Sequence, residues 1–272
     1  MNTSKMERNE LIDILTSDIV RITVGQVDRQ KTFSIHKKLF AKKAPVFYKM
    51  FDGGFKEGVT GLATLPYDSH EAFENFAQWL YFPSAETFSS HIVSNLLPQE
   101  NSSVARWELV ETIVFANKYC LDALSDLAMS SWIIHQGSTF PLEELRKITS
   151  YIVANTSHLC KARVYVARTW AWHILQHPEK DFYRPNTSNL DAVVKDRGFI
   201  AQVLNEIRCL ARETSFKGVL KDLPLCDYHH HDENNYCRAV SILRAIRTIE
   251  SLEIKRNSER LEAKSSKKRK LA

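Results

Sequence analysis

The sequence of 272 residues predicts an α+β domain followed by an all-helical region. Two segments near the N-terminus, 20–24 and 32–36, alternate apolar and polar side chains in the manner of half-buried strands. From residue 36 onward the apolar side chains follow helical spacing, apart from a short strand-like stretch at 62–65. After residue 137 the spacing is helical throughout. This order predicts a small sheet with its covering helices first, and helices alone behind it.

The first elements are bounded by turn and capping residues. The polar stretch 25–31 is typical of the loop of a β-hairpin between the two predicted strands. One or two helices are expected to begin near His36, and another is expected after the strand 62–65. Asp68, with Glu71 three residues later, predicts the capping box that opens this last helix.

The stretch from Ser17 to about Phe82 resembles the BTB/POZ domain, a module that dimerises and recruits partner proteins. Four motifs carry the resemblance: Asp18 before the first strand, F-x-I-H-K at 33–37, A-P-V-F at 44–47, and F-x-x-F-x-x-W-L-Y at 73–81. The string A-N-K-Y-C-L-D-A-L at 116–124 resembles the last two helices of such domains. The resemblance implies a BTB/POZ domain over 17–136, preceded by an N-terminal extension at 1–16.

The same resemblance implies a homodimer, because BTB/POZ domains associate through their first helices and N-terminal extension. The expected interface is apolar, and monomers seldom leave a large apolar patch in water. Two alternatives remain: the extension covers its own core, or the helices after Gly137 cover the patch within one chain. The predicted interface residues are Leu11, Ile12, Leu15, Leu39, Phe40, Phe47 and Met50.

Two charged residues and one histidine are candidates for function within this domain. Asp18 and Lys37 resemble the charged positions that line the partner groove of BTB/POZ domains, although local pairing or solvation explains them equally well. His36 invites a catalytic interpretation, but the resemblance implies a structural histidine there, and no nucleophile pairs with it in the sequence. The sequence also contains no Gly-rich phosphate loop, G-x-S-x-G elbow or H-E-x-x-H motif. We therefore expect a protein without enzymatic activity or a small-molecule substrate.

Residues 137–220 predict a helical extension packed on the first domain, a layout similar to that of fungal BTB proteins. Residues 221–254 predict a Cys/His loop followed by a docking helix. Thiolate and imidazole side chains in this loop could bind zinc tetrahedrally, but their spacing is not that of a recognised finger. The alternative is a polar loop that caps the next helix through Asp232 and Asn234. The candidate zinc ligands are Cys226, His229, His231 and Cys237.

The net charge of +5 is concentrated at the C-terminus. Residues 255–272 hold eight basic and two acidic side chains, a net charge of +6, which leaves the other residues at −1. A nearly neutral body is not expected to bind nucleic acid directly, since that affinity needs many phosphate contacts. The tail is similar to a bipartite nuclear localisation signal, whereas the alternative is a charged run that only solvates the chain end. Its two basic clusters are Lys255 with Arg256, and Lys267, Lys268, Arg269 and Lys270.

Composition narrows the class of protein further. No segment approaches the roughly 18 consecutive apolar residues of a membrane helix, and five scattered cysteines do not suggest a disulfide framework. We expect a protein–protein interaction module that dimerises and recruits transcriptional regulators as a nuclear protein. Cytoplasmic localisation is a secondary expectation. The alternative function is a substrate adaptor of a cullin-3 ubiquitin ligase.

Overall fold

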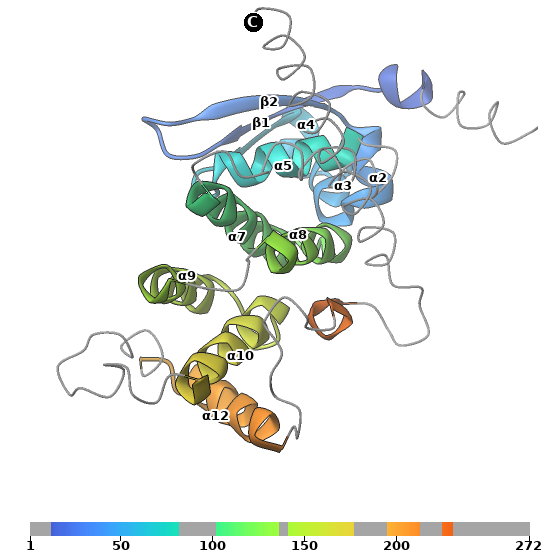
Figure 1. The fold of residues 1–272 in the computed structure, drawn as a ribbon. Helices are drawn as coiled ribbons and strands as arrows, with labels where there is room; N and C mark the ends of the chain where they lie inside the picture. Colours follow the sequence, from blue (N-terminus) through green and yellow to red (C-terminus); the bar gives the residue numbers. More distant parts are fainter. Residues whose placement is uncertain (1–11, 82–101, 136–140, 177–194, 213–224, 231–272) are drawn as a thin grey trace, which may run out of the picture.

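A computed structural model describes residues 12–81, 102–135, 141–176, 195–212 and 225–230 of the chain. These residues form mixed α+β structure that is mostly helical and contains one small sheet (Figure 1). The α+β class predicted from the sequence is therefore confirmed.

The sheet has three strands, β1 (Ile19–Val24), β2 (Lys31–His36) and β3 (Leu62–Leu65), in the order β2-β1-β3. β1 pairs antiparallel with β2 and parallel with β3, so that Ile22 lies opposite Phe33 on one side and Ala63 on the other. Val20, Ile22 and Val24 are buried, whereas the alternate residues of β1 face away from the core. The period-two pattern of the sequence fits this arrangement, in which the described residues cover one face of the sheet.

Four helices pack around the sheet: α2 (Lys38–Lys43), α3 (Pro45–Asp52), α4 (Lys56–Thr60) and α5 (His70–Tyr81). Pro45 occupies the first turn of α3, where its missing N–H removes no helical hydrogen bond. α5 runs along the covered face of the sheet (Figure 1). Its aromatic side chains meet those of α3, with the rings of Phe47 and Phe76 centred 4.9 Å apart.

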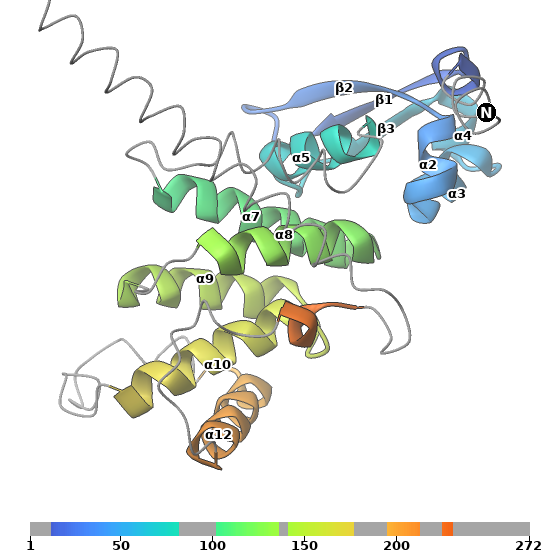
Figure 2. The same cartoon turned by 45° about the vertical axis from the view of Figure 1, so that its right-hand side comes forward.

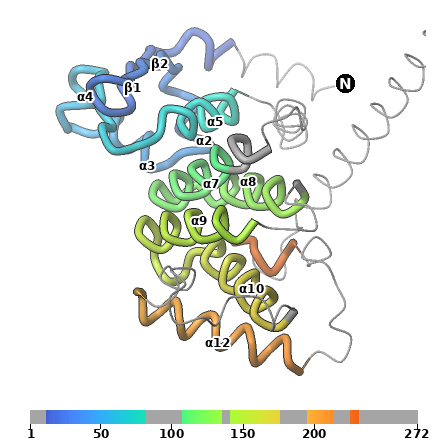
Figure 3. Tube along the Cα trace, turned by 60° about the vertical axis from the view of Figure 1, so that its left-hand side comes forward, coloured from blue at the N-terminus to red at the C-terminus, as the bar shows by residue number. Residues whose placement is uncertain are grey.

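The remaining helices follow one another away from the sheet (Figure 2). They are α7 (Ser102–Lys118), α8 (Asp122–His135), α9 (Leu142–Asn155), α10 (Lys161–Gln176) and α12 (Arg197–Arg212). The short 3-10 helix η4 (Leu225–Tyr228) lies beside α8 and α10 (Figure 3). One cluster of buried apolar residues extends from the sheet to α12, so the later helices pack on the α+β part instead of standing apart from it.

The start of α5 differs from the prediction by one residue. Ser69, and not Asp68, is the N-cap, because the Ser69 hydroxyl accepts the amide hydrogen of Ala72 at 3.2 Å. Asp68 instead binds side chains at and just beyond the end of α7: its carboxylate accepts hydrogen bonds from Lys118 at 2.8 and 2.9 Å and from Tyr119 at 2.9 Å. The predicted capping box is therefore wrong, since Asp68 is used to join two elements.

Candidate partner-binding surface

The predicted groove residues Asp18 and Lys37 are neighbours at the end of the β1–β2 pair. The amide of Lys37 donates a hydrogen bond to the carbonyl oxygen of Asp18 at 2.8 Å. The Asp18 side chain is exposed, whereas Lys37 Nζ lies 3.1 Å from Asp52 Oδ1 on α3. A hydrogen bond from Lys37, and then one from Tyr48, lowers the pKa of Asp52. A ligand at this place would meet a free aspartate beside a lysine already paired with Asp52.

The outer face of the sheet adjoins these residues and is open among the described residues. Ile19 and Leu62 are 57% and 53% exposed, and Arg21 lies directly opposite Leu62 in the β1–β3 register. These side chains face away from α5, since the residues that alternate with them are buried on the α5 side. The result is a small mixed surface of aliphatic and cationic side chains.

The segment before β1 adds two exposed apolar side chains. Ile12 and Leu15 are each 51% exposed. The segment is held to α2, because Asp13 forms an ion pair with Lys38 and the Ser17 hydroxyl accepts the Lys38 amide hydrogen at 3.4 Å. Leu11, the other predicted interface residue of this segment, lies outside the described residues.

The helical half of the predicted dimer interface needs correction. Phe40 and Phe47 are fully buried within one chain, and Leu39 is 8% exposed. Phe47 packs against aromatic rings of α5 and against Tyr119, which directly follows α7, with the ring centres of Phe47 and Tyr119 4.8 Å apart. These three residues therefore belong to the core of the α+β part and cannot form a free interface, while Met50 is partly buried.

His36 makes a contact typical of a structural histidine. Its Nδ1 lies 2.8 Å from the hydroxyl oxygen of Tyr81, and its amide donates to the same oxygen at 3.3 Å. The contact ties the end of β2 to the last residue of α5. Tyr81 closes the motif F-x-x-F-x-x-W-L-Y, but sequence reasoning did not predict this pairing.

The structure describes two of the four candidate zinc ligands. Cys226 is exposed at η4, and His229 is buried with Nε2 2.9 Å from the hydroxyl of Ser130 on α8. When Ser130 donates its hydrogen to the carbonyl of Asp126 at 2.8 Å, His229 Nε2 is the donor in its contact with Ser130. A nitrogen that carries this hydrogen is not available to a metal.

The other two ligands, His231 and Cys237, lie outside the described residues, as do the basic clusters of the tail. Among the residues that the structure does describe, no three His, Cys, Asp or Glu side chains are grouped so as to hold a metal ion. Zinc binding by the complete loop stays a prediction. His230 adds a second tether, since its amide and its Nδ1 lie 2.9 and 3.0 Å from Asp126 Oδ1.

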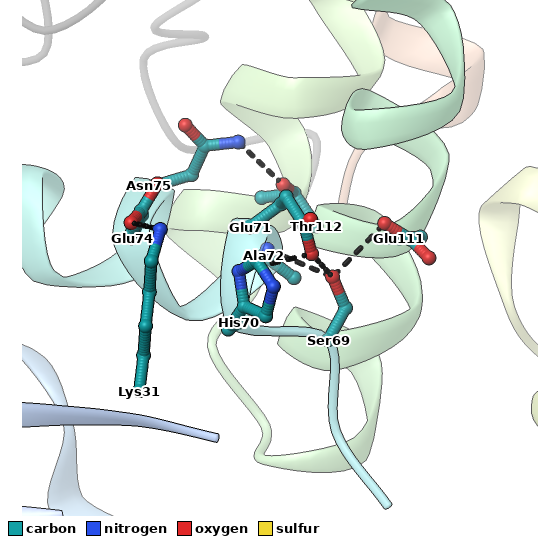
Figure 4. A network of polar contacts seen from close by, with 9 residues as sticks. All are labelled: Lys31, Ser69, His70, Glu71, Ala72, Glu74, Asn75, Glu111 and Thr112. Carbon is teal, nitrogen blue, oxygen red and sulfur yellow. Dashed lines mark hydrogen bonds and ion pairs between the residues drawn. The ribbon is translucent and has the colours of Figure 1, made fainter. Parts of the chain in front are cut away.

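Sequence reasoning missed a polar network between α5 and α7 (Figure 4). Asn75 donates to the hydroxyl of Thr112 at 2.9 Å, and the Ser69 hydroxyl lies 2.9 Å from carboxylate oxygens of both Glu71 and Glu111. The sequence did contain a signal for this network, because Glu111 and Thr112 interrupt the otherwise apolar run 109–116. Polar residues placed there need partners on the helix that covers them.

A comparison with protein-family models found no match, and neither did a comparison with curated proteins. In the described part of the chain, no helix is both long and apolar enough to cross a membrane.

Proposed function

We propose that this chain is a protein–protein interaction module of the BTB/POZ type, without enzymatic activity, that forms homodimers and recruits protein partners. One observation supports this most: residues of the separate motifs meet in one core. The rings of Phe33 and Phe73 are centred 4.7 Å apart, and those of Phe47 and Phe73 6.3 Å apart. His36 of the motif at 33–37 and Tyr81 of the motif at 73–81 are joined by a hydrogen bond. Such convergence is what a single domain built from these motifs requires.

The surface described above supports a binding role. The aliphatic side chains of Ile12, Leu15 and Ile19 are exposed, and Ile19 adjoins Asp18, whose carbonyl oxygen accepts the amide hydrogen of Lys37. Apolar contacts surrounded by polar groups are typical of interfaces between proteins. We assign the segment from Ile12 to Leu15 to the homodimer contact, and the Asp18 side of the sheet to other partners.

Light scattering on the full chain tests the dimer. The parent protein is expected to be a dimer, and the double variant Ile12→Asp with Leu15→Asp is expected to be a monomer with an unchanged circular dichroism spectrum. Val27→Asp is the matched control, since Val27 is 90% exposed but lies in the β1–β2 loop, away from this segment. A monomeric parent protein would refute the dimer, and a dimeric double variant would place its interface elsewhere.

We further propose that the protein acts in the nucleus as a regulator of transcription, which rests on the +6 charge of residues 255–272. Replacing 267–270 by alanine is expected to move a fluorescent fusion to the cytoplasm. The control replaces Arg197, Arg208 and Arg212, three exposed arginines of α12, and is expected to leave the signal nuclear. A parent fusion that is not nuclear contradicts this part of the proposal alone.

The alternative role, a substrate adaptor of a cullin-3 ubiquitin ligase, uses the same kind of module. Affinity purification of the full chain followed by mass spectrometry separates the two roles. Transcriptional regulators among the captured proteins support the nuclear role, whereas cullin-3 supports the adaptor role. An Asp18→Ala variant that captures the same partners equally well would remove Asp18 from the binding surface.

A further inference from the structure

The hydroxyl of Ser69 is surrounded by three polar groups at the junction of α5 and α7 (Figure 4). The amide of Ala72 donates to Ser69 Oγ at 3.2 Å. Glu71 Oε2 and Glu111 Oε2 each lie 2.9 Å from the same oxygen. The two carboxyl groups come from different helices and meet at one hydroxyl.

A count of hydrogens restricts the charge of this group. A serine hydroxyl carries one hydrogen and accepts through two lone pairs. The amide of Ala72 uses one lone pair, and the single hydrogen can be donated to only one of the two carboxyl groups. With that hydrogen used, the other carboxyl group forms a two-centre hydrogen bond over its 2.9 Å contact only if it carries a proton and donates it to Ser69 Oγ. The pair Glu71 and Glu111 therefore holds one proton when both contacts are made.

The surroundings decide which of the two carries the proton. Burial opposes ionisation of Glu71, but its own backbone N–H, the Ser69 hydroxyl and nearby His70 together hold its pKa below the usual range. Burial has the largest effect and raises the pKa of Glu111; the contact with Ser69 comes next and opposes this rise, whereas the negative charge of Glu71 adds to it. Of the two carboxyl groups, Glu111 therefore holds a proton more tightly than Glu71.

We propose that Glu111 is a proton-operated contact between α7 and α5: its neutral carboxyl group donates to Ser69, and loss of this proton as the pH rises weakens the junction. The charged groups that act on Glu111 are Glu71 and His70 of α5, and Glu111 in turn acts on Glu108 of α7 and Tyr151 of α9. Lys118, the cationic residue at the end of α7, forms its ion pair with Asp68 and not with Glu111. Ionised Glu111 would therefore lie beside two further carboxyl groups.

The direction of the effect follows from proton linkage. The folded protein binds the Glu111 proton more tightly than the unfolded chain does, because the folded pKa is raised. The stability from this group is complete below the unfolded pKa and is lost as the pH rises through the folded pKa. Glu71 acts in the opposite direction, since its lowered pKa gives stability that is lost as the pH falls.

Carbon-13 NMR of the glutamate carboxyl groups in the full chain tests the assignment. The resonances are assigned by their loss in the variants Glu111→Gln and Glu71→Gln. Glu111 is expected to titrate at a higher pH than Glu71, and in Glu71→Gln its titration is expected to shift to lower pH. Titration of Glu111 at or below the pH at which Glu71 titrates would overturn the proposal.

Unfolding by urea across the pH range tests the consequence for the junction. The folding equilibrium constant is measured for Glu111→Gln and for the parent, and the ratio of variant to parent is expected to rise with pH. The total rise approaches about tenfold for each pKa unit by which the folded pKa of Glu111 exceeds its unfolded pKa. Glu74→Gln is the control, because Glu74 lies on α5 but pairs with exposed Lys31, and its curve is expected to run parallel to that of the parent. Parallel curves for Glu111→Gln and parent would refute the switch.

If Glu111→Gln does not fold, the parent and Glu71→Gln still decide the question. The resonances that move when Glu71 loses its charge are then those of Glu111 and of Glu108, because the charge of Glu71 raises the pKa of both, and Glu108→Gln removes the second of them. The absence of any carboxyl resonance that shifts to lower pH in Glu71→Gln would refute coupling between the two groups.

Discussion

The hydroxyl of Tyr119 donates a hydrogen bond to Oδ2 of Asp68 at 2.9 Å, across 51 positions of sequence. The Asp68 side chain is only 7% exposed and also accepts from Lys118. Asp68 precedes α5, whereas Lys118 is the last residue of α7 and Tyr119 follows it, so this carboxylate joins the covering helix of the sheet to the helices behind it.

Replacing Asp68 by Asn is expected to lower the free energy of unfolding by about 1–3 kcal/mol, because a buried carboxylate with two donors is lost. Tyr119→Phe keeps the ring against Phe47 and leaves Asp68 with Lys118, so we expect a smaller loss of about 1 kcal/mol. Urea unfolding at neutral pH measures both. A larger loss in Tyr119→Phe than in Asp68→Asn would show that the hydroxyl, and not the carboxylate, dominates this junction.

The contact between Tyr119 and Asp68 predicts that the protein loses stability at alkaline pH. Burial first, and then the charge of Asp68, raises the pKa of Tyr119 in the folded protein. The folded state therefore holds this proton more tightly, and its contribution to stability falls as the pH rises above the unfolded value of about 10. Unfolding experiments above that pH should show a steeper loss for the parent than for Tyr119→Phe. Equal slopes would exclude Tyr119 as the cause.

Phe47 tests whether the aromatic cluster of the α+β part is core or interface. Phe47→Ala removes a fully buried ring that lies against Phe76 and Tyr119, and we expect a loss of about 3–5 kcal/mol. Val46→Ala is the matched control on the adjacent, exposed position, with an expected change within about 0.5 kcal/mol. Denaturant unfolding compares the two. A folded, monomeric Phe47→Ala protein of parental stability would restore the interface interpretation.

The correction at Phe40 and Phe47 shows what periodicity can predict. Helical spacing identified both as residues that must be buried, and both are buried. It could not say whether a second chain or the same chain covers them, because that depends on α5 and α7, which are distant in sequence. The strands could be predicted because alternation within β1 and β2 is a local pattern, which reflects one face of the sheet buried by the described helices.

The capping error at Asp68 has a similar cause. Asp and Ser are both favoured N-cap residues, and they are adjacent here. The choice between them is made by Lys118 and Tyr119, which draw the Asp68 carboxylate away from the start of α5. The proton proposed for Glu111 could not be predicted from the sequence either, because it depends on Glu111 of α7 lying close to Ser69.

Ser130 tests how the segment 225–230 is attached. Ser130→Ala is expected to cost about 1–3 kcal/mol, because it leaves the buried His229 Nε2 hydrogen without its acceptor. Thermal unfolding of the full chain measures this loss, and parental stability in Ser130→Ala would contradict the tether.

Cys226→Ser separates this tether from zinc binding. Cys226 is exposed, so without metal the substitution should change stability by less than about 0.5 kcal/mol. With zinc bound by the loop, the same substitution removes a ligand and its share of the folding energy. Elemental analysis of protein never treated with a chelator gives the metal content. About one zinc per chain, together with a destabilised Cys226→Ser, would establish the metal site.

Asp196 is expected to stabilise α12 in two separable ways. Its Oδ1 accepts the amide hydrogen of Phe199 at 2.7 Å as an N-cap and lies 3.2 Å from the guanidinium of Arg163 on α10, which is 6% exposed. Asp196→Ser retains a capping oxygen but leaves the Arg163 charge without this carboxylate, whereas Asp196→Ala removes both contacts. We expect Asp196→Ala to lower the free energy of unfolding by about 1 kcal/mol more than Asp196→Ser does, because this is the usual contribution of an N-cap. Urea unfolding of the two variants measures the difference directly. Equal losses would mean that the pairing with Arg163 alone holds the start of α12 on α10.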